Sequence, residues 1–153
     1  MVGATGAEVE VDTETGHVRV TRLINVADLG TPINPGIVAT QLSGGAVMQL
    51  GCTMSERMEY VNGQLTNASL ADYKIPGMRD MPDVMENDFV DARQPGGPHG
   101  AKGVGETATF GVSPAITNAI HDAVGVRLTA LPVTAEAVYR ALRANANDPL
   151  EDA

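Results

Sequence analysis

The sequence predicts a single α+β domain over residues 1–153, in which a mixed β-sheet with hairpins carries two main helices and a C-terminal helix. Apolar and polar residues alternate over 7–12 and again over 17–23, on either side of a turn-forming segment. This alternation predicts a hairpin with one buried face. Asn34-Pro35 and Ser113-Pro114 each place a capping side chain before a proline, the pattern typical of helix N-termini. A chain of this length makes about one domain.

The remaining elements follow from local patterns. The first helix is predicted to end near Gly51, and the second at Gly125, because glycine closes many helices. Asn62-Gly63 predicts a second hairpin. The other expected elements are an extended segment over 72–77, a strand over 83–90 with Val84, Phe89 and Val90 as its apolar residues, a short strand over 127–130, a last helix capped by Thr134, and a frayed tail over 145–153.

Composition excludes several functional classes. The chain has 10 Lys and Arg residues against 19 Asp and Glu residues, a formal net charge of −9, and no basic cluster that would bind nucleic-acid phosphates. No apolar run approaches the roughly 18 to 20 residues of a membrane span, and no signal peptide is evident, so we expect a cytoplasmic protein. With Cys52 as its one cysteine and three separated histidines, this chain alone predicts no metal site.

The first predicted helix has two different faces. One face is an apolar stripe at helical spacing, Ala39, Leu42, Ala46 and Leu50. The opposite face carries Gln41, Gly44, Gly45 and Met48. Two adjacent glycines inside a helix cost roughly 1 kcal/mol each relative to alanine, so a compensating close approach is expected. Both tight packing on a neighbouring element and approach of a ligand remain open.

A glycine-rich loop over 93–105 ends at Glu106. Its five glycines and two prolines make the backbone conformation more important than the side chains. A carboxylate at the end of such a loop can serve as a general base beside a bound anion or cofactor. The alternative is a surface loop in which Glu106 is solvated or caps the next helix, and in which Lys102 bonds carbonyl groups or solvent.

Several ordered motifs together resemble a known family. They are Ile33-Asn34-Pro35, Gln41-Leu42-Ser43-Gly44-Gly45, Ser69-Leu70-Ala71-Asp72-Tyr73-Lys74-Ile75-Pro76, the run from Pro95 to Glu106, Asn118-Ala119-Ile120, and Leu131-Pro132-Val133-Thr134. In this order and spacing they are similar to the C-terminal part of the molybdopterin-binding large subunit of the xanthine dehydrogenase / aldehyde oxidase family of molybdenum hydroxylases. The resemblance extends from about Ala7 to Leu142.

The resemblance implies an oxidoreductase that hydroxylates aldehydes or N-heteroaromatic compounds. It implies that Glu106 is the general base, which accepts a proton at the molybdenum centre. The implied cofactor is a molybdenum–molybdopterin cytosine dinucleotide shared with a partner chain. The residues that the resemblance places beside it are Gln41, Gly44, Gly45, Lys102, Gly103, Val104 and Gly105.

Large subunits of that family are several times longer than this chain, so the resemblance also implies partners. They are the remainder of the molybdopterin-binding subunit, an iron–sulfur subunit and a flavin subunit carrying FAD, without which the chain is expected to be inactive. The alternative is a non-catalytic assembly domain, in which the bare helix face packs on another protein and Glu106 is exposed.

Overall fold

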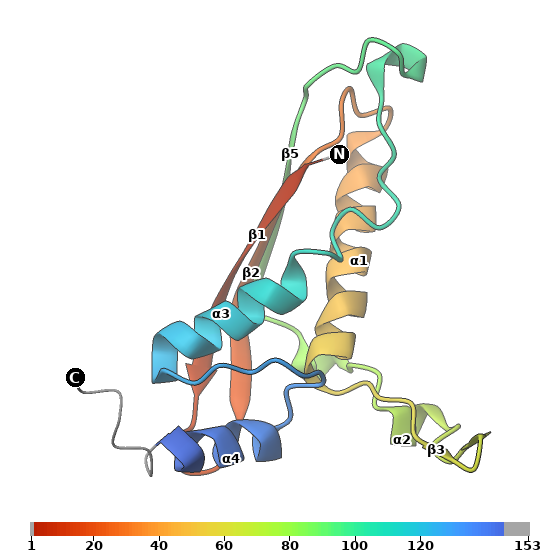
Figure 1. Ribbon diagram of the computed structural model, residues 1–153. Coiled ribbons are helices and arrows are strands. Elements are labelled where there is room, and N and C mark those ends of the chain that lie inside the picture. Colours follow the sequence, from red (N-terminus) through yellow and green to blue (C-terminus); the bar gives the residue numbers. More distant parts are fainter. Residues whose placement is uncertain (1, 146–153) are drawn as a thin grey trace.

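In the computed structural model, which describes residues 2–145, a three-stranded sheet in the order β1-β2-β5 packs against α1 and α3 (Figure 1). The strands are β1 Gly3–Val11, β2 Val18–Asp28 and β5 Val84–Val90, with a small hairpin of β3 Tyr60–Val61 and β4 Gln64–Leu65. The helices are α1 Pro35–Met54, α2 Leu70–Tyr73, α3 Val112–Val124 and α4 Ala135–Asn145, with 3₁₀ turns at Met78–Asp80 and Pro98–Gly100. The predicted α+β class is confirmed.

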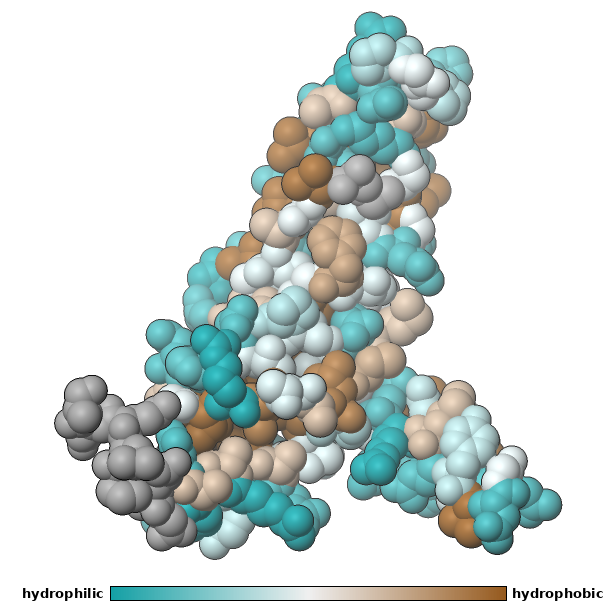
Figure 2. Space-filling view, in the orientation of Figure 1, coloured by the Kyte–Doolittle hydropathy of each residue, from teal (hydrophilic) through white to brown (hydrophobic). Residues whose placement is uncertain are grey.

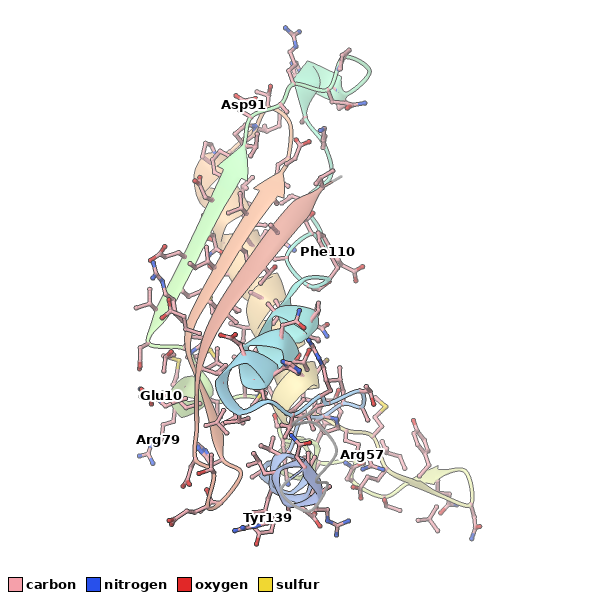
Figure 3. All side chains as sticks on the ribbon, turned by 60° about the vertical axis from the view of Figure 1, so that its left-hand side comes forward. Glu10, Arg57, Arg79, Asp91, Phe110 and Tyr139 are labelled. Carbon is pink, nitrogen blue, oxygen red and sulfur yellow. The ribbon has the colours of Figure 1, made fainter. Side chains whose placement is uncertain are left out.

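The sheet combines both directions of strand pairing. β1 and β2 form the predicted antiparallel hairpin, with one register shift between Glu8 and Val9. β2 and β5 are parallel, so the chain must cross over between them, and α1 lies within this crossover. Figure 3 shows the three strands side by side, with Phe110 next to β1. Every second residue of each strand points toward the helices and contributes to the core.

α1 begins and packs as its sequence predicts. The Asn34 side chain accepts a hydrogen bond from the Ile37 N–H at 3.1 Å, and Pro35 occupies the first turn. Leu42, Ala46 and Leu50 of the predicted stripe are buried against the sheet and α3, whereas Ala39 is half-buried and Val38 beside it is buried instead. The helix continues to Met54, three residues beyond the predicted end at Gly51.

Ion pairs connect neighbouring strands on the face of the sheet that is turned away from the helices. Arg22 on the central strand reaches Glu8 on β1 at 3.3 Å and Glu86 on β5 at 2.9 Å. Arg19 likewise contacts Glu10 and Asp83. Such exposed pairs contribute little each, but here they tie neighbouring strands together.

Two predicted extended segments are wrong. Residues 72–77 lie partly in α2, because the Ser69 side chain caps a short helix that Lys74 ends in a left-handed conformation. Residues 127–130 form no strand. They connect buried Val126 to buried Val133, whose N–H donates to the Thr53 carbonyl of α1, and these two anchors hold the segment beside the helices.

Two details of the predicted elements also need correction. α3 is capped by Gly111 rather than Ser113, whose hydroxyl instead bonds Gln49 and Thr53 of α1 at 2.7 Å each. In β5, Val84 and Val90 point outward, because the residues that face the helices are Met85, Asn87 and Phe89.

An arm, defined as residues 57–80, leaves the lower end of α1, projects with β3 and α2 (Figures 1 and 2), and returns over 74–80 to the body of the molecule beside α1 and β2. None of its residues is buried. Seven large apolar side chains are nonetheless exposed on it: Met58, Tyr60, Val61, Leu65, Leu70, Ile75 and Met78. The arm therefore has no core of its own.

Candidate active site

The Glu106 turn, defined as residues 106–111, follows the predicted glycine-rich loop. The loop is fixed to the end of β2 by the Lys102 N–H, which donates to the Leu29 carbonyl at 2.9 Å, and by a bridge between Gly30 and Ala101. The Glu106 carbonyl accepts bonds from the backbone N–H and the hydroxyl of Thr109, at 3.1 and 2.9 Å. The backbone of Glu106 is thus held by hydrogen bonds, while the residue itself is exposed to solvent.

The Glu106 turn lies against the double-glycine face of α1. The Gln41 amide donates from Nε2 to the Gly105 carbonyl at 2.8 Å. A Cβ atom at Gly45 would lie 3.4 Å from Ala108 Cβ, and both residues are buried. The structure therefore brings Gln41, Gly45, Gly105 and Glu106 together, although they lie about 60 positions apart in sequence.

The two adjacent glycines of α1 have different surroundings. Gly45 lets the helix approach the Glu106 turn closely, so tight packing explains this glycine. Gly44 is exposed, and a Cβ atom there would meet nothing within 4 Å. Met48, one turn further, is 51% exposed. The open face of α1 beside the Glu106 turn therefore centres on Gly44.

The loop before Glu106 presents unused backbone donors. Among residues 2–145, no hydrogen bond from the backbone N–H of Gly103, Val104, Gly105 or Glu106 to another residue is found. Successive free N–H groups are suited to an anion or to the polar edge of a cofactor.

Lys102 forms an ion pair that joins the loop to β2. Its ammonium group contacts the Asp28 carboxylate at the end of β2, and both side chains are largely buried. The hydrogen bond from Lys102, together with that from the Gly30 N–H, lowers the pKa of Asp28 below its ordinary value. No sequence pattern indicated Asp28 as this partner, because it is 74 positions away.

We expect this ion pair to make the free energy of unfolding depend on pH. Because the pKa of Asp28 is lower in the folded chain, its contribution is complete above its ordinary pKa of about 3.9 and disappears as the pH falls through the folded value. The stability difference between the wild type and Asp28→Asn should therefore shrink from pH 6 toward pH 2. Urea unfolding at several pH values measures it.

Asp122→Asn is the matched control, because Asp122 is exposed on α3 and forms no ion pair among the described residues. A difference for Asp28→Asn that stays constant down to pH 2 would contradict this role of the pair.

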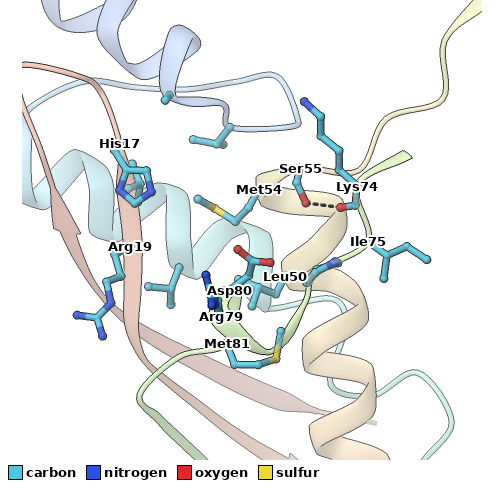
Figure 4. Close-up of a pocket in the computed structure, with 15 residues that line it drawn as sticks. His17, Arg19, Leu50, Met54, Ser55, Lys74, Ile75, Arg79, Asp80 and Met81 are labelled. Carbon is cyan, nitrogen blue, oxygen red and sulfur yellow. Dashed lines mark hydrogen bonds between the residues drawn. The ribbon is translucent and has the colours of Figure 1, made fainter. Parts of the chain in front are cut away.

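One hollow on the surface lies away from these residues. It has a volume of about 400 Å³ and lies between the start of β2, the C-terminal end of α1 and residues 74–81 (Figure 4). Leu50, Met54 and Met81 line it, with Lys74 and Arg79 at the same site. No residue predicted for the cofactor site lines it.

A smaller apolar hollow of about 190 Å³ borders the loop. It is lined by Leu29, Ile33, Ile37 and Val104, and by Lys102. Lys102 and Val104 are the two predicted site residues that it contains.

The other candidate groups do not form a reactive site. Burial, followed by the nearby Glu56 carboxylate, raises the pKa of the Cys52 thiol, which disfavours the nucleophilic thiolate. No cluster of three or more His, Cys, Asp or Glu side chains suited to a metal occurs within 2–145. Nor does any helix in that range combine the length and apolarity needed to cross a bilayer.

Comparison with known proteins identifies the family. The model of the molybdopterin cofactor-binding domain matches residues 1–82, more than half of the chain. The chain belongs to this molybdopterin cofactor-binding family. Its relatives identify it further as a part of the molybdenum hydroxylase family, as the sequence motifs indicated.

Two curated relatives illustrate the match. The chain is 36% identical over 140 residues to a probable xanthine dehydrogenase subunit of Bacillus subtilis, covering 92% of this chain and 19% of that protein. It is 37% identical over 144 residues to the aldehyde oxidoreductase of Megalodesulfovibrio gigas, covering 94% of this chain and 16% of that protein. The chain thus spans less than a fifth of the length of these relatives.

Solved structures agree with the fold. The aldehyde oxidoreductase from Desulfovibrio gigas superposes with a TM-score of 0.83 at 36% identity, over 90% of this chain and 15% of that one. The quinoline 2-oxidoreductase from Pseudomonas putida gives a TM-score of 0.81 at 35% identity, over 88% of this chain and 18% of that one. The arrangement of the sheet, α1 and α3 is therefore that of a molybdenum hydroxylase segment.

Proposed function

We propose that this chain supplies the general base and part of the cofactor pocket of a molybdenum hydroxylase that oxidises aldehydes or N-heteroaromatic compounds. The observation that carries the proposal is the hydrogen bond from Gln41 to the Gly105 carbonyl. It places the Glu106 turn beside the open Gly44 face of α1.

The residues suited to hold the cofactor fall into two groups. Gly44 offers a helix surface without side-chain bulk. The N–H groups of Gly103, Val104 and Gly105, which bond no residue within 2–145, offer donors. Gly45 and Lys102 act indirectly. Gly45 lets the Glu106 turn pack against α1, and Lys102 holds the loop to β2 through Asp28. The group proposed is molybdenum–molybdopterin cytosine dinucleotide, which supplies two-electron redox chemistry when bound.

Glu106 is proposed to accept the proton released during oxidation of the substrate. An exposed carboxylate is a weak proton acceptor, and removal from water favours its protonated form. Closure of the site by a second polypeptide would therefore suit Glu106 to this role, while the bonds to its carbonyl keep its backbone in place.

The partner proposed to close the site is the remainder of a molybdopterin-binding subunit. The seven exposed apolar side chains of the arm support this, because such patches in soluble proteins mark interaction surfaces. The relatives also contain more than four-fifths of their length outside the matched segment. An iron–sulfur subunit and an FAD subunit, in the cytoplasm, would then receive the electrons.

Gly44→Leu tests the proposed cofactor surface. Leucine has open space at this position, and it favours a helix over glycine by close to 1 kcal/mol. The chain should therefore fold at least as stably, yet lose cofactor. We expect the chain assembled with the remainder of the subunit to retain less than about a tenth of its molybdenum, measured by plasma mass spectrometry, since overpacking a fitted site costs ~1–3 kcal/mol.

Asp122→Leu on the exposed side of α3 is the control, and it should keep a full molybdenum content. A full molybdenum content in Gly44→Leu would show that the Gly44 face of α1 does not contact the cofactor. It would favour the alternative, a non-catalytic assembly domain, which the exposure of Glu106 in the described chain also allows.

A further inference from the structure

A row of polar side chains crosses the face of the sheet that packs against the helices. Thr5, Asn25 and Asn87 lie opposite one another on β1, β2 and β5, and all three point toward the helices. Asn25 is only 2% exposed. A buried amide costs free energy unless it is hydrogen-bonded, so its partners matter.

The row is bonded in sequence and ends on α1. The Thr5 hydroxyl donates to Asn25 Oδ1 at 3.1 Å, and Asn25 Nδ2 donates to Asn87 Oδ1 at 3.4 Å. Asn87 Nδ2 then donates to the Ser43 hydroxyl at 2.7 Å, and this hydroxyl donates to the Ala39 carbonyl at 3.1 Å. The shortest bond in the row is thus the one that joins the sheet to α1.

Both ends of the row adjoin the elements that carry the candidate site. Ser43 lies directly before Gly44 on α1. At the other end, Gly111 packs on Thr5 so closely that a Cβ atom on it would overlap the Thr5 hydroxyl. Gly111 closes the turn that begins at Glu106, and that turn returns to α1 through Gly105 and Gln41. The contacts therefore form a closed circuit that links the sheet, α1 and the Glu106 turn.

We propose that this row positions the Glu106 turn relative to α1, with Ser43 and Asn87 as positioning residues. The inference rests on the proposed function, because it concerns the spacing of the same site. Apolar contacts allow a helix to slide on a sheet, whereas the Asn87–Ser43 bond fixes one residue of α1 to one residue of β5. A shift of about 1 Å between reacting groups can cost up to ~100-fold in rate.

Ser43→Ala separates positioning from stability. It removes the acceptor of Asn87 Nδ2 but leaves the bonds within the sheet, and alanine favours the helix over serine. We expect the amide hydrogens of Thr109 and Val112, which bond carbonyl groups within the Glu106 turn, to exchange roughly fivefold faster in the 153-residue chain. In the assembled subunit with unchanged molybdenum content, kcat for an accepted aldehyde should fall about tenfold with KM unchanged.

Two variants serve as controls. Thr117→Ala removes a hydroxyl that likewise donates one turn back, to the Ser113 carbonyl at 3.0 Å, but does not link two elements, so it should change neither readout. Ser43→Thr keeps a hydroxyl and should restore both. Unchanged exchange in Ser43→Ala would overturn the proposal, as would faster exchange with kcat within twofold of wild type.

The same assembly distinguishes this inference from the proposed function. If Glu106→Gln is inactive while Ser43→Ala turns over at the wild-type rate, the positioning role fails and the general base stands. If Glu106→Gln is fully active, the proposed function itself fails, and the exchange of the Thr109 and Val112 amide hydrogens still decides whether the row holds the turn.

Discussion

Glu106→Gln should lower turnover of the assembled enzyme by roughly 100- to 10,000-fold, the range typical of positioned proton transfer. Glutamine keeps the size of the side chain but cannot accept the proton. The backbone of the turn is held by bonds to the Glu106 carbonyl and by the bond from Gln41 to Gly105, none of which uses the carboxylate. Steady-state kinetics should therefore show the loss in kcat with molybdenum content unchanged.

Glu14→Gln is the matched control, because Glu14 is exposed in the turn between β1 and β2, far along the chain from the site. It should turn over at the wild-type rate. Activity of Glu106→Gln within about threefold of this control, a difference below 1 kcal/mol in barrier, would show that another group takes the proton.

Leu42→Ala should destabilise the chain by about 2–5 kcal/mol. Leu42 is fully buried where α1 meets the sheet, and deletion of its side chain leaves a cavity between elements that are packed on both sides. The free energy of unfolding, measured by urea denaturation, is the direct test. A loss of this size is a large fraction of the stability of a typical domain.

Met48→Ala is the comparison on the same helix. Met48 is 51% exposed and faces away from the core, so its truncation should change stability by less than about 0.5 kcal/mol. Equal losses in the two variants would contradict the assignment of the two faces of α1.

Local sequence signals predicted the elements that local chemistry determines. The Asn34 cap, the apolar stripe of α1 and the Gly125 end of α3 need only neighbouring residues, and each is confirmed. The segment over 72–77 was predicted wrongly because a local cap, the Ser69 side chain, starts a short helix there. Contacts with distant residues decide the segment over 127–130. For the second segment, the Thr53 carbonyl takes the N–H of Val133.

The candidate site shows the same division. The glycine-rich loop and the bare face of α1 were visible in the sequence. Only the fold shows that Gly45 serves packing while Gly44 stays open, because their difference depends on Ala108. The partnership of Lys102 with Asp28, and the polar row through Asn25, join strands and loops that no spacing pattern relates.

The central claim is that Glu106 and the Gly44 face of α1 border one molybdenum site. A crystal structure of the chain assembled with the remainder of a molybdopterin-binding subunit, with the metal located by its anomalous scattering, tests this most directly. We predict the metal on the Gly44 side of α1, with the Glu106 carboxylate turned toward it. A metal bound elsewhere, with Glu106 facing solvent, would contradict this claim.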